Sequence, residues 1–273
     1  MKRTISLLLV FIFLVSCSTV PITGRKRVNF VSDAQILPMS FAQYQGFLSE
    51  NKLSDNATKT NEVKAVGARI SKAVDRFMRI NDMKAEADSY RWEFNLVEDK
   101  TVNAWCMPGG KVVFYSGILP ICANTDGIAA VMGHEVAHAF AKHGQERMST
   151  GTIQQLGGVA VAVATANKSP EQRQIWNTVY GVGSSVGVML PFSRTHEREA
   201  DRLGLVFMLM AGYNGEEAAQ VWVRMSQRKG AENAPPEFLS THPSNQSRIN
   251  DLKAYLPEAK VLAKKFNAKA LSN

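Results

Sequence analysis

The chain has 273 residues, with 32 Lys and Arg against 24 Asp and Glu, and its formal net charge at pH 7 is +8. This length suits one large domain rather than two. The basic balance favours anionic lipid surfaces or acidic, unfolded polypeptides as partners. Because the basic residues are scattered and form no stripe interleaved with aromatic residues, we expect no nucleic-acid binding.

The N-terminus has the pattern of a secretion signal. Lys2 and Arg3 precede an apolar run from Ile5 to Val15, and these eleven residues are too few to span a bilayer as a mature helix. The segment Leu14-Val15-Ser16-Cys17 resembles a bacterial lipobox. This resemblance implies cleavage before Cys17 and acylation of its thiol and amine, with palmitate among the acyl groups. The alternative is an ordinary signal peptide with an incidental cysteine.

Removal of residues 1–16 takes away Lys2 and Arg3 and no acid, so the net charge falls from +8 to +6. Multiple acyl chains hold a membrane firmly, since each buried methylene contributes roughly 0.8 kcal/mol. Ser18 follows Cys17, whereas an aspartate at that position usually marks retention in the inner membrane. We therefore expect a lipoprotein of the bacterial outer membrane that faces the periplasm.

The remaining chain is expected to contain a tether over residues 17–40 and one folded domain over residues 41–273. Apolar residues at helical spacing predict a helix from Glu62 to Ile80. Alternation predicts a strand from Trp92 to Val97, and a second strand is expected from Lys111 to Tyr115.

The most informative motif is His134-Glu135-Val136-Ala137-His138, which reads H-E-x-x-H inside an apolar helical pattern. Residues four apart share a helix face, so both imidazoles can reach one metal ion. Glu135 can then take a proton from a metal-bound water. The helix should begin near Asp126, because Asn124, Thr125 and Asp126 are good capping residues. This pattern is typical of a zinc hydrolase, and the peptide bond is its usual target.

A catalytic zinc takes three protein ligands and leaves one position open for water. Glu197 and Asp201 are four residues apart in a predicted helix that begins near Thr195, and both therefore face the same way. Glu197 could bind the zinc while Asp201 accepts a hydrogen bond from a ligand imidazole. His196 and Glu199 lie on other faces of this helix. The alternative is a solvated, charged helix.

Residues 150–191 contain two small, apolar runs, and both are well short of the roughly 20 residues needed to span a bilayer. We expect a helical hairpin that packs on the domain or lines its cleft. A partly exposed hairpin that touches lipid or a partner is the alternative.

The last predicted features are a helix from Glu216 to Arg228, a loop at Ala234-Pro235-Pro236 and a closing segment from Asn250 to Tyr255. Pro243 keeps His242 out of helical geometry. His242 is therefore a loop residue that either packs locally or approaches the metal, as a zinc cap or as a donor to the oxyanion.

Two cysteines follow Cys17, namely Cys106 and Cys122. An oxidising compartment permits a disulfide between them, and two separate buried thiols are an equal alternative. No second thiol lies two to four residues from either of them, so we expect neither to bind zinc. The same lack of context argues against a cysteine protease.

Four segments together resemble the HtpX and CAAX-prenyl-protease type of zinc metallopeptidase, metallopeptidase family 48, over residues 60–255. They are H-E-x-x-H, Ser193-Arg194-x-x-Glu197-x-x-Ala200-Asp201, the strand region from Val102 to Gly117, and Thr241-His242-Pro243 followed by Arg248-Ile249. Many relatives are polytopic membrane enzymes, which this chain does not resemble. It is similar to a soluble, lipid-anchored branch found in bacterial envelopes.

The resemblance implies an α+β, mostly helical, zincin-like (gluzincin) domain with a small β-sheet beside the H-E-x-x-H helix. It also implies one Zn²⁺ per chain held by His134, His138 and Glu197, with Glu135 as the catalytic base. His242, Arg248 and His196 are candidates for the oxyanion donor.

The expected function is that of a membrane-anchored endopeptidase that degrades misfolded or misassembled envelope proteins. The strand at Asn103, Ala104 and Trp105 could pair with an extended substrate through backbone hydrogen bonds. Two alternatives stay open. One is an outer-membrane assembly chaperone with a latent or capped zinc site, and the other is hydrolysis of something other than a peptide.

Overall fold

The structure is a computed structural model, and it describes residues 17–185, 189–227, 238, 242 and 246–272. The predicted signal (residues 1–16), the predicted loop at Ala234-Pro235-Pro236, and residues Thr241 and Pro243 lie outside the described part. The chain divides into two compact units, one of residues 1–36 and 142–197 and the other of residues 37–141 and 198–273. Residues 142–197, which include the predicted hairpin at about 150–191, group with the N-terminal residues rather than with the rest of the predicted domain.

The larger unit contains a three-stranded sheet of order β3-β5-β4. Strand β3 (Glu93–Val97) pairs parallel with β5 (Lys111–Tyr115), and β4 (Ala104–Met107) pairs antiparallel with β5. The turn between β4 and β5 needs glycine, because Gly109 and Gly110 have φ values of +83° and +86°. The strands predicted at 92–97 and 111–115 are confirmed.

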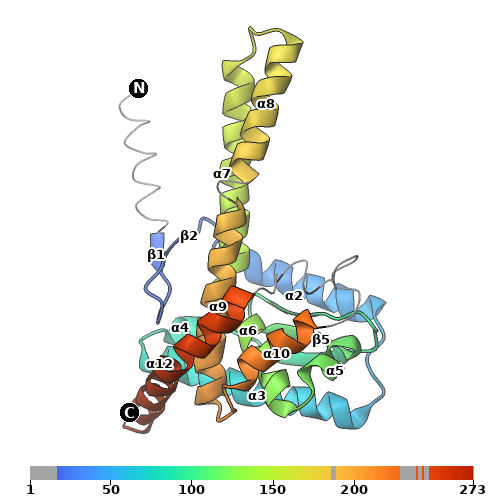
Figure 1. The fold of residues 1–273 in the computed structure, drawn as a ribbon, viewed down its shortest axis with the longest axis vertical. Coiled ribbons are helices and arrows are strands. Elements are labelled where there is room, and N and C mark those ends of the chain that lie inside the picture. The colour runs from blue at the N-terminus through green and yellow to red at the C-terminus, as the bar shows by residue number, and fades with distance from the viewer. Residues whose placement is uncertain (1–16, 186–188, 228–237, 239–241, 243–245, 273) are drawn as a thin grey trace. The chain divides into compact units, whose positions relative to one another are not determined.

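Helices pack around this sheet (Figure 1). They are α2 (Asp33–Glu50), α3 (Ala57–Ile80), α4 (Lys84–Ser89), α5 (Leu119–Cys122), α6 (Thr125–Phe140), the part of α9 (Leu190–Met210) from residue 198 onward, α10 (Glu217–Ser226) and α12 (Gln246–Leu271). Helix α3 contacts both α6 and β3, and α6 contacts β4. The H-E-x-x-H helix therefore lies beside the small sheet, as the family resemblance implies.

The core of this unit lies where α3, α6 and α9 meet. The rings of Phe77, Phe140 and Phe207 pack edge to face, with centroids 5.1–5.8 Å apart. All three side chains are at most 2% exposed. Such aromatic pairs add about 0.5–1.5 kcal/mol each beyond the burial of their area, and they join α3, α6 and α9.

The smaller unit contains the hairpin of β1 (Cys17–Thr19) and β2 (Lys26–Val28), helices α7 (His143–Ala164) and α8 (Pro170–Ser184), and the first turns of α9. The segment expected to be a tether thus contains a strand pair and the start of α2. Helices α7 and α8 form the predicted helical hairpin (Figure 1). Tyr180 donates a hydrogen bond to the carbonyl of Gln154 at 2.7 Å.

The apolar side chains of this hairpin are exposed rather than part of a core. Helix α8 has no buried residue, and Leu156, Val163 and Ile175 are 61–72% exposed. Two helices that pack only along one narrow face each leave their remaining apolar residues outside. No helix among the described residues is long and apolar enough to cross a bilayer.

Candidate metal centre

Helix α6 presents the H-E-x-x-H residues. It begins at Thr125 after Asn124, whose side chain accepts a hydrogen bond from the Gly127 amide at 2.8 Å. His134 and Glu135 are each 3% exposed, and His138 is half-buried. The Nε2 atoms of His134 and His138 lie 3.1 Å apart. The spacing of four residues therefore brings both imidazoles to one point, as helical geometry requires.

Asp201 fixes the tautomer of His134. Its Oδ1 lies 3.0 Å from Nδ1 of His134, and both side chains are buried. A carboxylate can only accept here, so the proton of the imidazole resides on Nδ1 and Nε2 presents a lone pair. This is the arrangement that a metal-binding histidine needs.

His242 completes the ring of imidazoles. Its Nδ1 lies 3.2 Å from Nε2 of His134, although 108 residues separate the two in sequence. The His242 amide donates to the carbonyl of Phe238 at 2.8 Å, and the two rings stack at a centroid distance of 4.7 Å. His242 Nε2 also lies 3.7 Å from Oε1 of Glu135. The segment expected to be a loop thus places His242 against the metal-site histidines.

Glu197 lies one helical turn before Asp201 on α9. The ligand atoms of His134, His138, Glu197 and His242 all lie within 4.8 Å of one another, so these residues could hold one metal ion. Glu199, two residues further along α9, does not belong to this group.

The donor set fits zinc. Zn–N bonds of about 2.0–2.1 Å in a tetrahedral site place two nitrogen ligands about 3.3 Å apart. The observed nitrogen separations of 3.1 and 3.2 Å are close to this value. Imidazole nitrogens and a carboxylate are also the ligands that zinc prefers outside thiolate sites.

Arg248 binds the Asp201 carboxylate and packs on the Trp222 ring. The guanidinium of Arg248 donates two hydrogen bonds to the Asp201 carboxylate, at 2.6 and 2.7 Å, and lies 3.7 Å over the Trp222 ring. Burial disfavours the charged carboxylate, but the charge and hydrogen bonds of Arg248, together with the bond to His134, lower the pKa of Asp201 to about 2. Asp201 is therefore ionised throughout the neutral range.

Two of the three candidate oxyanion donors form hydrogen bonds to buried carboxylates. Arg248 is 3% exposed and holds Asp201, while His196 is fully buried and its Nε2 lies 3.0 Å from Glu146. His242 is the remaining candidate of the three. Trp222 and Phe238 were missed by sequence reasoning, because an aromatic residue at helical spacing looks like any core residue.

The predicted substrate strand lies near the metal centre. Strand β4 is at one edge of the described sheet and contacts α6. It contains Ala104 and Trp105, while Asn103 precedes it and accepts a hydrogen bond from the Tyr115 amide through its carbonyl at 3.1 Å. Burial, and secondarily the charge of Glu135, raise the pKa of the Cys106 thiol on this strand. The strand is therefore within electrostatic reach of Glu135.

The two cysteines are separate thiols. Cys106 is half-buried and Cys122 is buried, and neither forms a disulfide. Burial raises the pKa of Cys122 to about 12. The thiol therefore stays protonated and unreactive at neutral pH.

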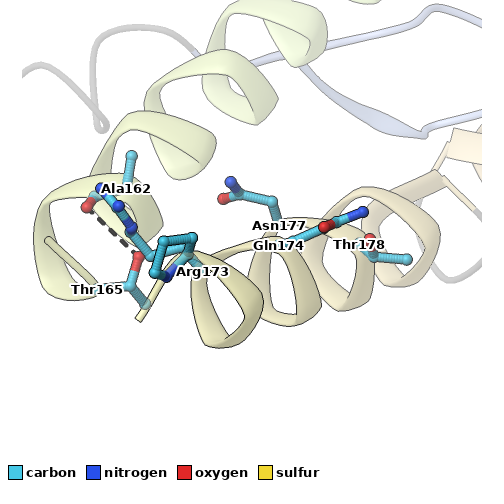
Figure 2. Close-up of a pocket in the computed structure, with 7 residues that line it drawn as sticks. Ala162, Thr165, Arg173, Gln174, Asn177 and Thr178 are labelled. Carbon is cyan, nitrogen blue, oxygen red and sulfur yellow. Dashed lines mark hydrogen bonds between the residues drawn. The ribbon is translucent and has the colours of Figure 1, made fainter. Parts of the chain in front are cut away.

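A hollow near the end of the α7–α8 hairpin is lined by Thr165, Arg173 and Asn177 among others (Figure 2). It contains no histidine or carboxylate, so it offers none of the ligands or bases that the chemistry needs. The clustered histidines remain the candidate site.

Residues 62–256 match Peptidase family M48. The chain belongs to this family. It is 33% identical over 243 residues to the mitochondrial metalloendopeptidase OMA1 of Schizosaccharomyces pombe, covering 89% of this chain and 67% of the relative. It is 36% identical over 194 residues to the OMA1 of Saccharomyces cerevisiae, covering 68% and 53%. It is also 25% identical over 243 residues to the beta-barrel assembly-enhancing protease of Escherichia coli, covering 86% and 47%.

Family membership confirms the predicted class of zinc metallopeptidase and its zincin-like fold. The chain spans 67% of the S. pombe relative and about half of the S. cerevisiae and E. coli proteins.

The prediction of a bacterial outer-membrane location is contradicted. The relatives from two yeasts, Arabidopsis thaliana, Bos taurus, Danio rerio and Homo sapiens are all named as mitochondrial. A short N-terminal pattern of basic and apolar residues does not by itself specify a compartment.

Proposed function

We propose that the chain is a zinc-dependent endopeptidase, held at a membrane surface by an acylated Cys17, that cleaves non-native polypeptides. The observation that carries the proposal is the convergence of His134, His138, Glu197 and His242 beside the carboxylate of Glu135. The names of its relatives, metalloendopeptidase and beta-barrel assembly-enhancing protease, support proteolysis linked to the upkeep of other proteins.

His134, His138 and Glu197 would hold the zinc. When bound, the ion supplies Lewis acidity, which lowers the pKa of a coordinated water and polarises the scissile carbonyl. Glu135, between the two histidines on α6, would act as the general base that takes a proton from the attacking water and later gives it to the leaving amine. Asp201 holds the proton of His134 on Nδ1, so the lone pair on Nε2 is available to the metal.

Substrate would bind as an extended strand along the outer edge of β4, the edge strand of the described sheet. Backbone hydrogen bonds of this kind read little side-chain sequence, which suits a broad range of unfolded substrates. The segment that would pair is Asn103, Ala104 and Trp105. Because the Asn103 carbonyl accepts from the Tyr115 amide of β5, the backbone of Ala104 is the part that faces the outer edge. Trp105 packs on Phe47 with ring centroids 4.9 Å apart, so its part of the strand is held in place.

The test compares zinc content and casein cleavage of the wild type with those of Glu135→Gln. The variant should keep its zinc and lose cleavage by about 10²-fold or more, the usual effect of removing a general base. Glu258→Gln on the exposed surface of α12 is the matched control and should behave as wild type. Full cleavage by Glu135→Gln would overturn the mechanism.

One observation favours a second candidate function. His242 lies in the ligand cluster itself, 3.2 Å from His134, and a histidine there would close the open coordination position. A chain whose zinc is capped in this way would act mainly as an assembly chaperone. It would then bind unfolded polypeptides without cleaving them, and Glu135→Gln would leave that binding and any assembly activity unchanged.

A further inference from the structure

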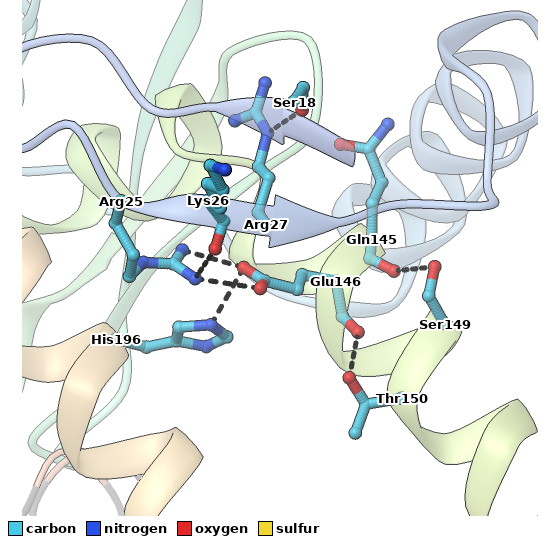
Figure 3. A network of polar contacts seen from close by, with 9 residues as sticks. All are labelled: Ser18, Arg25, Lys26, Arg27, Gln145, Glu146, Ser149, Thr150 and His196. Atoms are coloured by element: carbon cyan, nitrogen blue, oxygen red, sulfur yellow. Dashed lines mark hydrogen bonds and ion pairs between the residues drawn. The ribbon is translucent and has the colours of Figure 1, made fainter. Parts of the chain in front are cut away.

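A buried carboxylate on α7 connects the N-terminal hairpin to α9. Glu146 is 2% exposed, and its two oxygens accept hydrogen bonds from the Arg25 guanidinium at 2.8 and 2.7 Å (Figure 3). One of these oxygens also accepts from Nε2 of His196 at 3.0 Å. Charge-assisted, bidentate hydrogen bonds of this kind are strong, and they also fix the relative orientation of the two side chains.

The negative charge of Glu146 is compensated by the Arg25 guanidinium. Burial disfavours the ionised form of Glu146, but hydrogen bonds and charges from His196 and Arg25 outweigh it and lower the pKa of Glu146 to about 2. The carboxylate is therefore an acceptor at neutral pH, and His196 must donate through Nε2. The His196 ring also stacks on that of His143, with centroids 4.0 Å apart and planes 10° from parallel.

His196 directly precedes Glu197 in the helix α9. A helical residue cannot rotate or shift without its neighbour, because consecutive residues share one rigid backbone. Holding the fully buried ring of His196 therefore fixes the helical turn that carries Glu197. Neither Glu146 nor Arg25 belongs to the metal-ligand group.

Arg25 belongs to the segment that follows Cys17. It immediately precedes β2, which pairs with β1 in a register that sets Cys17 opposite Val28. The same segment is tied to α7 a second time, since Asp33 accepts hydrogen bonds from Lys142 at 2.6 Å and Gln145 at 2.7 Å. The segment after Cys17 thus contacts the start of α7, and Glu146 of α7 forms the hydrogen bond to His196.

We propose that Glu146 is a positioning residue for the metal ligand Glu197, and that Arg25, in the hairpin after Cys17, holds Glu146 in place for this role. The proposal rests on the proposed function only in taking Glu197 as a zinc ligand. Outer partners of metal ligands are worth about 10–100-fold in metal affinity. Loss of the Arg25–Glu146–His196 contacts should weaken zinc binding by that amount without removing any ligand.

The experiment measures the zinc dissociation constant of the full chain by chelator competition, together with the melting temperature of the metal-free protein. The variants are Arg25→Ala, Arg25→Lys and Glu146→Gln, and Lys26→Ala is the matched control because Lys26 is an exposed basic residue of the same hairpin. Arg25→Ala and Glu146→Gln should raise the dissociation constant about 10–100-fold. Arg25→Lys, which keeps the charge but not the two-pronged contact, should lie between them and the wild type, and Lys26→Ala should match the wild type.

Glu197→Gln separates this proposal from the one on which it rests. If Glu197→Gln leaves zinc binding unchanged, the ligand assignment itself fails. If Glu197→Gln weakens zinc binding while Arg25→Ala and Glu146→Gln lower only the melting temperature, the residues are structural and the positioning role is overturned. Arg25→Lys is conservative enough to fold, so an unchanged zinc affinity in that variant and in Arg25→Ala overturns the role even if Glu146→Gln fails to fold.

Discussion

Gly133 and Gly204 lie in direct backbone contact where α6 and α9 cross. A Cβ atom built on Gly204 would lie 2.8 Å from the carbonyl carbon of Gly133 and 2.8 Å from the amide nitrogen of His134. A Cβ on Gly133 would lie 2.8 Å from the carbonyl oxygen of Gly204. The two glycines thus let the helices approach closely at the residue before His134, the first candidate metal ligand. This approach brings Asp201, one turn away on α9, to His134.

Gly204→Ala should push α6 and α9 apart, because the contacting atoms are backbone and cannot rotate away. We expect a loss of about 1–3 kcal/mol in the free energy of unfolding, the usual range for overpacking. Zinc affinity should fall as well, since His134 moves away from Asp201. Gly46→Ala is the control, because nothing lies within 4 Å of its Cβ on the exposed face of α2. It should stabilise the helix by about 1 kcal/mol, as measured by urea unfolding.

Substitution of single candidate ligands should show whether Glu197 or Glu199 binds the metal. His134→Ala, His138→Ala and Glu197→Gln should each lose bound zinc, because each removes a candidate ligand. Glu199→Gln should keep it, since Glu199 lies outside the ligand group although it is only 4% exposed. Metal content after dialysis is the measurement. Zinc retained by Glu197→Gln but lost by Glu199→Gln would contradict the assignment.

His242→Ala should raise basal cleavage, including cleavage of the chain itself. The imidazole lies among the ligands, 3.2 Å from Nε2 of His134, where it can occupy the position that water and substrate need. The resting enzyme would then be self-inhibited, and substrate would have to shift the population toward an open state. Initial rates on casein at equal zinc content are the measurement. A decrease of about 10²-fold would instead assign His242 as an oxyanion donor, and an unchanged rate would reject both roles.

Cys17→Ala should abolish labelling with palmitate and release the chain from the membrane fraction. Acyl chains on Cys17 provide the anchor in the proposed function, and without them little apolar area is left at the N-terminus to hold lipid. Cys106→Ala, which changes a half-buried thiol elsewhere, is the control and should retain the label. Retention of unacylated Cys17→Ala in membranes would assign the attachment to the exposed apolar side chains of α7 and α8.

Features set by local geometry could be predicted from the sequence. The four-residue spacing of His134 and His138 places both on one face wherever that helix packs, and the same holds for Glu197 and Asp201. Asn124 begins α6 because its side chain can reach an amide three residues ahead. Alternation likewise predicted the strands at 92–97 and 111–115. Each of these predictions depends only on backbone periodicity or on the reach of one side chain over a few residues.

Contacts between distant segments were decided by the tertiary structure alone. His242 reaches His134 across 108 residues, Arg248 reaches Asp201 across 47, and Arg25 reaches Glu146 across 121. The sequence offered His242 and Arg248 as candidates, but whether either approached the metal or a carboxylate depended on how the helices cross, down to the contact of Gly133 with Gly204. Exposure of the α7–α8 hairpin was decided in the same way. A run of small apolar residues packs equally well in a core or in a two-helix hairpin, and only the path of the chain selects between them.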